Sequence, residues 1–573
     1  MKRLLKYFNG YKKECVLGPL FKLFEATLEL IVPLIIAEII DTGIGLGDTG
    51  YVVKMCLCLL ALGAVGLVFS VTAQYFSAKA AVGFVTKVRA ALFGHIQTLS
   101  YSEIDRIGTS TMITRMTSDS NQVQTGINLT LRLLLRSPFV VFGAMIMAFT
   151  IDESIAWIFA VTIAALCIVV FGIMLISMPL YKKVQERVDG TMRKTRENMS
   201  GARVIRAFCN EDDEVRDFSE KNGALAKAQK LVGAVSALLN PITYVIINVA
   251  IVYLIYTGAV QVDLGNLTDG EVVALYNYMS QILVELIKMA NLIITITKSL
   301  ASAGRISAVF DIGSSMEDGT LTASEGSGEY AVEFDGVSLT YGGAGDASLS
   351  DISFRVRRGE TVGIIGGTGS GKSSLVNLIP RFYDATAGRV LINGADVREY
   401  TQDSLRDSIG IVPQKAVLFA GSVRDNMRWG NEGATDEEIM SAIKTSQAYD
   451  VVSDKGGLGA RIEQGGKNLS GGQRQRLTIA RALVGHPDIL ILDDSASALD
   501  FATDAALRRA IREASGDTTV FIVSQRASSI MHADKIIVLD DGRAVGIGTH
   551  DELLKTSEVY KEIYASQFEE VSK

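Results

Sequence analysis

A glycine-rich segment between a strand pattern and a helical pattern has the residue types needed to bind the phosphates of a nucleotide. Residues 361–365 are mostly apolar, and the segment after them reads G-x-x-x-x-G-K-S before a helical pattern over 374–379. Glycines let successive backbone N–H groups turn toward an anion, and the helix N-terminus adds its dipole. A glycine turn without a ligand is the alternative, but the strand-loop-helix context favours phosphate binding. The residues expected to contact ATP are Gly366, Gly367, Thr368, Gly369, Ser370, Gly371, Lys372, Ser373 and Ser374.

The chemistry at this loop also depends on residues from two later strands. Lys372 should reach the β- and γ-phosphates, while Ser373 and Asp493, which ends an apolar strand, should share Mg²⁺. In the P-loop ATPases that this pattern resembles, the position after the Mg²⁺-binding aspartate normally carries a glutamate that activates water. Here that position is Asp494, whose side chain is one methylene shorter. Gln525 stands where a histidine would be expected to contact the γ-phosphate. These two departures predict a chain that binds ATP but hydrolyses it slowly by itself.

Further short segments accompany the loop in a fixed order. Tyr341 could stack on adenine, although by itself it would indicate only packing, and Gln414 could link Mg²⁺ to a neighbouring domain, although by itself it would be a surface residue. A Leu-Ser-Gly-Gly-Gln segment begins a helix over 474–483, which gives a second helix N-terminus suited to an anion. Asp500 ends the loop that follows the apolar strand ending at Asp493. The residues of the Leu-Ser-Gly-Gly-Gln segment are Leu469, Ser470, Gly471, Gly472 and Gln473.

The composition indicates a chain that is half membrane and half soluble. Of its 573 residues, 48% are apolar, which is high for a soluble protein, yet 21% are charged, which is high for a purely membrane protein. The net charge of −7 gives no reason to expect nucleic acid as a partner. The five cysteines lack the spacing of metal ligands, so free thiols are expected.

Six apolar stretches are long enough to cross a lipid bilayer as helices. The short connections at 41–50, 151–153 and 261–271 contain no Lys or Arg, whereas the long connections contain many. This positive-inside bias predicts a multi-pass protein of the cell (plasma or inner) membrane with both termini and the soluble domain in the cytoplasm. The basic N-terminus lacks the cleavage site of a signal peptide. The six stretches are 16–40, 52–75, 133–150, 154–178, 240–260 and 272–296.

The connections between the spans are themselves helical in pattern. Residues 51–99 contain no proline and can form one helix of about 75 Å, more than twice the hydrocarbon thickness, so it must project into the cytoplasm. Near residue 312 the sequence becomes polar and glycine-rich, which marks a linker. Beyond the linker, strand patterns alternate with helical patterns. The predicted architecture is an α-helical polytopic membrane domain of six long helices with cytoplasmic extensions, plus an α/β P-loop ATPase domain. Its boundaries are 1–310 for the membrane domain with an N-terminal elbow helix, 311–330 for the linker and 331–573 for the nucleotide-binding domain.

Polar residues repeat at helical spacing within three of the spans. Polar residues inside a membrane are candidates for a transport path if they face a cavity. The alternative is hydrogen bonding between helices, together with a Glu285–Lys288 ion pair and contact between Glu25 and Lys22. Carboxylates in such a path would suit a cationic amphipathic substrate. The candidate path residues are Glu29, Asn240, Tyr244, Asn248, Asn277, Gln281 and Glu285, with Glu25 and Glu38 on the first span as well.

Together these motifs resemble the ATPase of an ATP-binding cassette (ABC) transporter, and the six preceding spans are similar to the exporter-type half-transporters. The resemblance covers essentially the whole chain, and the Leu-Ser-Gly-Gly-Gln signature is specific for this family. It implies ATP and Mg²⁺ as cofactors, and a head-to-tail dimer in which one chain's P-loop and the other chain's signature hold each ATP. It also implies that segments near 105–116 and 208–215 are coupling helices that dock onto the ATPase domains.

The departures at Asp494 and Gln525 belong to this chain's own P-loop site, whereas its signature is intact. This asymmetry resembles the degenerate-site subunit of heterodimeric bacterial multidrug exporters. It implies a partner half-transporter with the usual glutamate and histidine, and hydrolysis mainly at the site that the partner completes.

Three functions remain open from the sequence. The first is export of hydrophobic or amphipathic compounds across the lipid bilayer. The second is an ATP-sensing regulatory or channel subunit, against which the intact signature argues, since a sensor would not need to complete a partner's site. The third is an exporter-fold importer of metal chelates. No peptidase domain is expected before the first span, which begins within about 15 residues of Met1.

Overall fold

The computed structural model describes residues 3–322, 328–342, 345–495, 498–514 and 516–568, and the chain forms two compact units. The first comprises residues 1–97 and 110–312, and the second comprises residues 98–109 and 313–573. Part of the predicted linker, residues 323–327, and Ser497 of the loop before Asp500 lie outside the described residues. Each unit has its own hydrophobic core.

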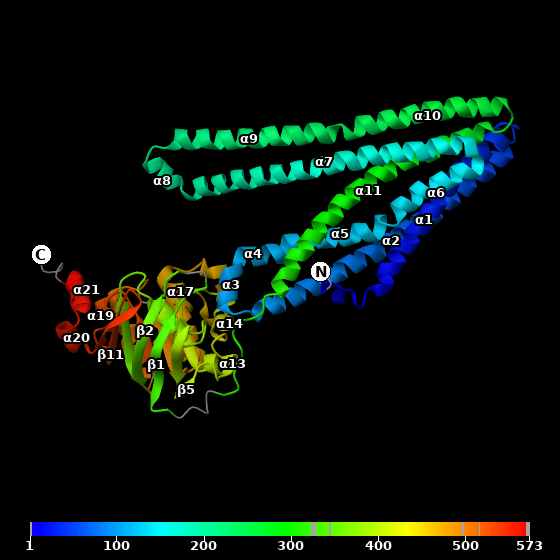
Figure 1. Ribbon diagram of the computed structural model, residues 1–573. Helices are drawn as coiled ribbons and strands as arrows, with labels where there is room; N and C mark the ends of the chain where they lie inside the picture. Colours follow the sequence, from blue (N-terminus) through cyan, green and yellow to red (C-terminus); the bar gives the residue numbers. More distant parts are fainter. Residues whose placement is uncertain (1–2, 323–327, 343–344, 496–497, 515, 569–573) are drawn as a thin grey trace. The chain divides into compact units, whose positions relative to one another are not determined.

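The first unit consists of long helices with short helical turns between them (Figure 1). Helices α7 and α9 run side by side, and α10 continues the direction of α9. The long helices are α1 (Lys12–Glu38), α2 (Thr49–Gln97), α5 (Ser120–Leu133), α6 (Arg136–Ile151), α7 (Glu153–Ser200), α9 (Glu211–Ala237), α10 (Leu239–Asp263) and α11 (Asp269–Phe310). Shorter turns are η1 (Leu4–Phe8), η2 (Ile39–Ile44), α4 (Thr109–Thr114), η3 (Arg115–Asp119) and α8 (Ala202–Ala207).

Among the residues that the structure describes, five helical stretches have the length and apolar composition to cross a membrane: Thr49–Gln97, Thr109–Ile151, Glu153–Ser200, Glu211–Asp263 and Asp269–Phe310. The expected single helix over 51–99 is confirmed as α2, whose 49 residues correspond to about 74 Å. The predicted first span corresponds to α1, which has 27 residues and is long enough to cross a bilayer. It is not among the five; its sequence includes Lys22, Glu25 and Glu29.

Polar contacts stabilise the N-terminus of α11, which follows the short connection at residues 261–271. Thr268 and Glu271 form a capping box in which each side chain accepts from the other residue's backbone N–H. Asp41, in the turn after α1, accepts hydrogen bonds from the Thr268 hydroxyl at 2.6 Å and from the Gly270 N–H at 2.8 Å. The carboxylate therefore links the end of the first helix to the positive end of the last one.

The second unit is built on a six-stranded sheet in the order β12-β11-β3-β10-β9-β6, parallel except for β12. All five residues of β9 and of β10 are buried, as expected for strands covered on both faces. The strands are β3 (Thr361–Gly366), β6 (Ile409–Val412), β9 (Ile489–Asp493), β10 (Thr519–Val523), β11 (Lys535–Asp540) and β12 (Arg543–Gly548). An antiparallel sheet contains β1 (Tyr330–Leu339), β2 (Leu349–Arg357), β4 (Ala387–Ile392) and β5 (Ala395–Asp396), and β7 (Gly421–Ser422) pairs with β8 (Arg461–Ile462).

Helices cover these sheets and carry the nucleotide motifs at their ends. The longest are α15 (Asp436–Thr445), α17 (Gly471–Val484), α18 (Phe501–Ala514) and α21 (Glu558–Phe568). The shorter helices are α3 (Tyr101–Ile107), α12 (Lys372–Leu378), α13 (Gln402–Asp407), α14 (Val423–Met427), α16 (Tyr449–Asp454), α19 (Ala527–Ile530) and α20 (His550–Thr556), with 3-10 turns at Gly457–Gly459 and Gln464–Gly466. Ligands of such sheets bind beyond the carboxyl ends of the parallel strands, and β3, β9 and β10 end next to one another.

Candidate nucleotide site and membrane charge network

The glycine-rich loop leaves β3 at Gly366 and enters α12 at Lys372. Gly371 precedes the helix with φ of 92°, in the left-handed region that favours glycine. A Cβ atom there would lie 2.7 Å from the Ser348 carbonyl oxygen and 2.8 Å from Leu349 Cδ2. A Cβ atom at Gly366 would lie 2.1 Å from the Leu539 carbonyl oxygen. Close packing therefore leaves no room for a side chain at either glycine, and at Gly371 the backbone conformation favours glycine as well.

Lys372 bends back over this loop. Its Nζ donates to the carbonyl oxygens of Gly366 at 2.9 Å and Gly367 at 2.6 Å. Burial lowers the pKa of Lys372, while the charges of Asp494 and Asp493 oppose that shift. A nucleotide phosphate entering the loop would give this ammonium group an anionic partner in place of neutral carbonyl oxygens.

Ser373 and Asp493 lie together, as the sequence predicts for a shared Mg²⁺. The Ser373 hydroxyl donates to Asp493 Oδ1 at 3.1 Å, and Asp493 is buried at the end of β9. Burial, followed by the nearby charge of Asp494, raises the pKa of the Asp493 carboxyl. Hydroxyl, carboxylate and amide oxygens are the ligands that Mg²⁺ prefers, so Ser373, Asp493 and Gln414 fit this ion. Within the described ranges, no group of three or more His, Cys, Asp or Glu side chains could hold a metal ion.

Asp494 has an unusual backbone conformation directly after the strand. Its φ of 44° lies in the left-handed region, which aspartate tolerates better than most residues. Its N–H donates to the Val523 carbonyl oxygen at 3.0 Å, and Gln414 Nε2 lies 3.5 Å from its Oδ2. Burial raises the pKa of the Asp494 carboxyl, while contact with Gln414 opposes that rise. The base position is thus joined to the end of β10, just before Gln525.

A cavity of about 430 Å³ collects most of the predicted residues. Its lining includes Thr368, Gly369, Gly371, Lys372, Ser373, Ser374, Gln414, Asp493, Asp494 and Gln525. The sequence reasoning missed Asp346, Ala347, Ser348, Asp541 and Gly542, which also line it. The φ of 42° at Asp541 and the Asp-Gly pair mark a turn after β11, but only the sheet order places that turn beside β3. Gly366, Gly367 and Ser370 are in the loop but are not part of this lining.

Tyr341 lies beside the helix that follows the glycine-rich loop. Its hydroxyl donates to Ser374 Oγ at 3.0 Å, and its ring is edge-on to Tyr383, with 4.9 Å between centroids. Burial raises the pKa of Tyr341. Its predicted stacking on adenine stays a prediction.

Helix α3, from the first predicted coupling segment, packs within the second unit. The Tyr101 ring lies 4.6 Å from that of Phe382, and Tyr383 donates a hydrogen bond to Asp105 at 2.6 Å. Burial, together with this contact to Asp105, raises the pKa of Tyr383. Through Tyr383 and Tyr341, a continuous set of contacts therefore joins Asp105 to the P-loop helix.

The signature segment forms the start of helix α17 and does not contribute to the described lining of this cavity. Ser470 accepts from the Gln473 N–H at 3.3 Å and donates its own N–H to Gln473 Oε1 at 2.9 Å, a capping box that starts α17. Of the described residues that line the cavity, none comes from 469–473. Asp500 accepts from the N–H and the hydroxyl of Thr503, at 2.9 Å each, and so begins α18.

Two candidate path residues are instead part of a charge network between helices of the first unit. Arg136 of α6 donates to Glu285 of α11 at 2.6 Å and to Glu29 of α1 at 2.5 Å. Ser137 and Lys288 also donate to Glu285, both at 2.8 Å. Arg136 and Glu285 are buried. For Glu29 and Glu285 the structure therefore favours the interhelical alternative.

The other candidate path residues make mainly local contacts. Asn248 and Asn277 each donate to a carbonyl oxygen four residues earlier, and Asn240 and Tyr244 are exposed. Gln281 Oε1 is buried and has no hydrogen-bond partner among the described residues. Glu25 pairs with Lys22 at 2.5 Å, and Glu38 accepts from Tyr51 at 3.2 Å. Arg136, at the start of the predicted third span, links α6 to both α1 and α11.

We expect the Glu285→Ala variant to have a markedly lower thermal unfolding midpoint, because it leaves Arg136 and Lys288 without a shared carboxylate. Breaking a buried pair by removing one partner typically costs about 3–5 kcal/mol. Removing both sides in Arg136→Ala with Glu285→Ala should cost less than the sum of the single changes. Gln281→Ala, one turn away on α11, is the control and should leave the midpoint nearly unchanged. Equal midpoints for the Gln281 and Glu285 variants would contradict this interpretation.

Comparisons with known proteins match both units. The family model described as the ABC transporter transmembrane region matches residues 15–286, and the model described as ABC transporter matches residues 349–497. An ABC transporter ATP-binding protein of Mycobacterium tuberculosis is 36% identical, over 98% of this chain and 97% of its own length. A Bacillus subtilis protein named for multidrug export is 33% identical over 99% of both chains, and the ATP-dependent lipid A-core flippase of Desulfotalea psychrophila is 34% identical over 84% of both.

One solved structure supports the fold. A bacterial Atm1-family ABC exporter with ATP bound superposes with a TM-score of 0.79 at 24% identity, covering 97% of this chain and 98% of that one. The chain therefore belongs to the ABC transporters as an exporter-type half-transporter, in which a multi-pass transmembrane region and an ATP-hydrolysing cassette share one polypeptide.

Proposed function

We propose that this chain is one subunit of a heterodimeric exporter of hydrophobic or amphipathic compounds, and that its own P-loop site binds Mg-ATP but hydrolyses it slowly. The observation that carries the proposal is that Asp494 and Gln525 line the same cavity as Lys372, Ser373 and Asp493. The residues expected to bind phosphate and metal therefore share a cavity with the two positions expected to act on water and on the γ-phosphate, and these two positions carry atypical residues.

The slow hydrolysis follows from distance. A general base must lie about 2.6–3.2 Å from the water that it activates. Asp494 is one C–C bond, about 1.5 Å, shorter than glutamate, and a displacement of that size can cost on the order of 10²-fold in rate. The left-handed φ of 44° and the Val523 contact hold its backbone, which limits how far it can move to compensate.

The heterodimer follows from the position of the signature. Ser470 is exposed at the start of α17 and outside this chain's own cavity lining, which suits a role in a second chain's site. Two copies of this chain would carry two slow sites, whereas a partner with glutamate and histidine at the positions of Asp494 and Gln525 would supply a fast one.

The proposed class of substrate rests on the names of two relatives and on the polar residues of the first unit. The names of two relatives refer to multidrug export and to a lipid A-core flippase, and both kinds of cargo are apolar or amphipathic. We place the cargo along Asn240, Tyr244, Asn248, Asn277 and Gln281, with both termini in the cytoplasm and domain boundaries at 1–310, 311–330 and 331–573. Uptake of fluorescent cations into inverted vesicles containing this chain and its partner tests export. Movement in the opposite direction would favour the importer function.

We expect the purified chain alone to bind Mg-ATP tightly but to hydrolyse it far below the median enzyme rate of about 10 per second. The physical reason is a complete phosphate and metal site with a base that does not reach its water. Equilibrium binding of ATP and steady-state phosphate release on the same sample check both parts, with Lys372→Ala as the non-binding control. Turnover of several per second by the chain alone would contradict the proposal.

A further inference from the structure

The end of α21 contacts the switch segment, residues 523–527, through one side chain. Gln567 Nε2 donates to the Gln525 carbonyl oxygen at 2.8 Å, and its Oε1 accepts from the Ala527 N–H at 2.8 Å. One amide group therefore binds the backbone on both sides of Arg526. A paired donor and acceptor fixes the orientation of the peptide units as well as their distance.

Helix α21 is itself held firmly against the unit. Tyr560 is fully buried, and its hydroxyl lies 2.8 Å from His550 Nδ1 of α20. Tyr564 packs against the core and lies 5.1 Å from the His550 ring. Gln567, in contrast, is exposed at the last turn. Its side chain can therefore be changed without opening the core that anchors the helix.

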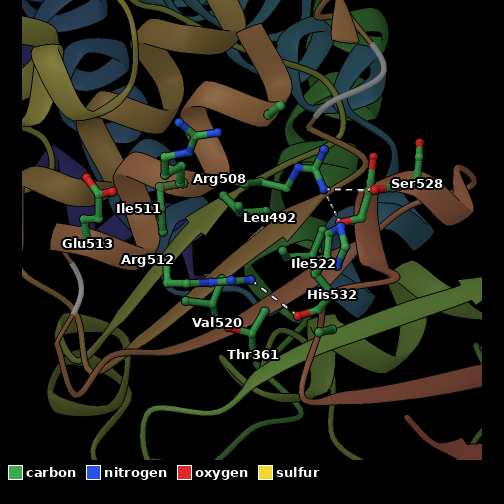
Figure 2. Close-up of a pocket in the computed structure, with 14 residues that line it drawn as sticks. Thr361, Leu492, Arg508, Ile511, Arg512, Glu513, Val520, Ile522, Ser528 and His532 are labelled. Carbon is green, nitrogen blue, oxygen red and sulfur yellow. Dashed lines mark hydrogen bonds between the residues drawn. The ribbon is translucent and has the colours of Figure 1, made fainter. Parts of the chain in front are cut away.

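The helix that follows the switch segment is held from a second direction. Figure 2 shows Arg508 of α18 directed at Ser528 of α19, and its Nη1 donates to the carbonyl oxygens of Ser528 and Ser529 at 3.0 Å each. Arg512 donates to the His532 carbonyl oxygen at 3.3 Å. Helix α18 thus holds the body of α19, while Gln567 holds its first residue and the residue that lines the nucleotide cavity.

Other backbone contacts of the switch segment join it to β3, the strand that precedes the glycine-rich loop. The Ser524 N–H donates to the Ile364 carbonyl oxygen at 3.0 Å, and the Arg526 N–H donates to Ser524 Oγ at 2.9 Å. Gln525 lines the cavity together with Lys372 and Asp494. Gln567 therefore binds the main chain of a residue that lines the cavity in which the nucleotide phosphates are expected.

We propose that Gln567 is a positioning residue for this chain's own nucleotide site. It holds the switch segment so that the Gln525 amide meets the γ-phosphate, and it thereby makes the site prefer ATP over ADP. This inference rests on the proposed function, in which the P-loop of this chain binds ATP. ADP lacks the γ-phosphate, so its affinity should not depend on Gln567.

Binding of Mg-ATP and Mg-ADP to the purified full-length chain tests the proposal. Gln567→Ala should weaken ATP binding by about threefold to tenfold, the range expected for losing one or two neutral hydrogen bonds, and leave ADP binding unchanged. Gln567→Glu keeps the acceptor for the Ala527 N–H but loses the donor, so it should have an intermediate effect. Ser566→Ala is the matched control, since that exposed neighbour only donates to Ile563 of its own helix.

A double-mutant cycle distinguishes positioning from a general loss of stability. If Gln567 acts through Gln525, adding Gln567→Ala to Gln525→Ala should have no further effect on ATP affinity. Equal losses for ATP and ADP, or additive losses in the double variant, would overturn the inference. Lys372→Ala separates the two levels: if it leaves ATP binding intact, the proposed function fails. If Lys372→Ala abolishes binding while both Gln567 variants bind ATP as the wild type does, only this inference fails.

Discussion

Damage to the signature of this chain should nearly abolish ATP hydrolysis by the assembled transporter, whereas damage to its P-loop should have a smaller effect. The signature variant is Ser470→Ala with Gly471→Glu, which removes the cap of α17 and puts a carboxylate where a phosphate of the partner's nucleotide would bind. Loss of a preorganised donor at a reacting phosphate costs on the order of 10²-fold in rate. In the proposed heterodimer, Lys372→Ala removes binding energy from a site that is expected to contribute little hydrolysis, so a decrease of no more than about tenfold is expected.

The control for this comparison is a second helix with the same kind of cap. Thr435 and Glu438 form a capping box at the start of α15, so Thr435→Ala should cost a similar free energy of helix stability, about 0.5–2 kcal/mol, without loss of hydrolysis. Steady-state ATPase of the complexes, at equal amounts of assembled protein, decides the order. An inactive Lys372 variant beside an active signature variant would mean that Asp494 is a working base and that the asymmetric heterodimer is wrong.

Restoring the two atypical residues should give this chain hydrolytic activity. Asp494→Glu lengthens the base by one methylene, and Gln525→His supplies an imidazole at the γ-phosphate, so phosphate release by the isolated chain should rise on the order of 10²-fold. A second copy of the chain can complete each site, because its signature is intact, and the rate should therefore increase with protein concentration. A double variant that remains as slow as the wild type would show that the defect lies elsewhere.

Asp541→Glu is the matched control for that restoration. Asp541 also has a left-handed φ, of 42°, and it lines the same cavity. The same added methylene at that position should leave hydrolysis unchanged, because Asp541 follows β11, whereas the predicted base follows β9. An equal gain from both substitutions would point to a general change in the cavity instead of a restored base.

That Lys372, Ser373 and Asp493 lie together could be predicted because their motifs are local. A glycine-rich loop between a strand and a helix is a short-range pattern, and the three residues line one cavity. Ser348 and Gly542 could not be predicted in the same way. They reach the cavity because β11 pairs with β3, a neighbour relationship that no short segment contains.

The contacts missed in the sequence are those between distant residues. Gln567 contacts the backbone at Gln525, 42 residues earlier, and a backbone contact requires no particular residue type from its partner. Arg136 lies at the start of the predicted third span, and its charge is compensated by carboxylates 107 and 149 residues away, a pairing that no short segment contains. The helical pattern identified Glu29 and Glu285 as polar positions on two different spans, but it did not identify Arg136 as the cation that lies between them.

The pairing of Glu29 with Arg136 has a consequence for how the membrane unit is made. Helix α1 carries Lys22, Glu25 and Glu29 near its middle, and a charge at the centre of a helix disfavours insertion by about 2.5–3.5 kcal/mol. Lys22 and Glu25 can neutralise each other within one turn, but Arg136 is synthesised 107 residues after Glu29, or roughly 5–20 s later at normal translation rates. During that interval the Glu29 carboxylate lacks its partner on α6, so α1 should be held in the bilayer less stably until α6 is made. The insertion machinery would retain α1, and an early stop before Arg136 should yield a first helix that slips out of the bilayer.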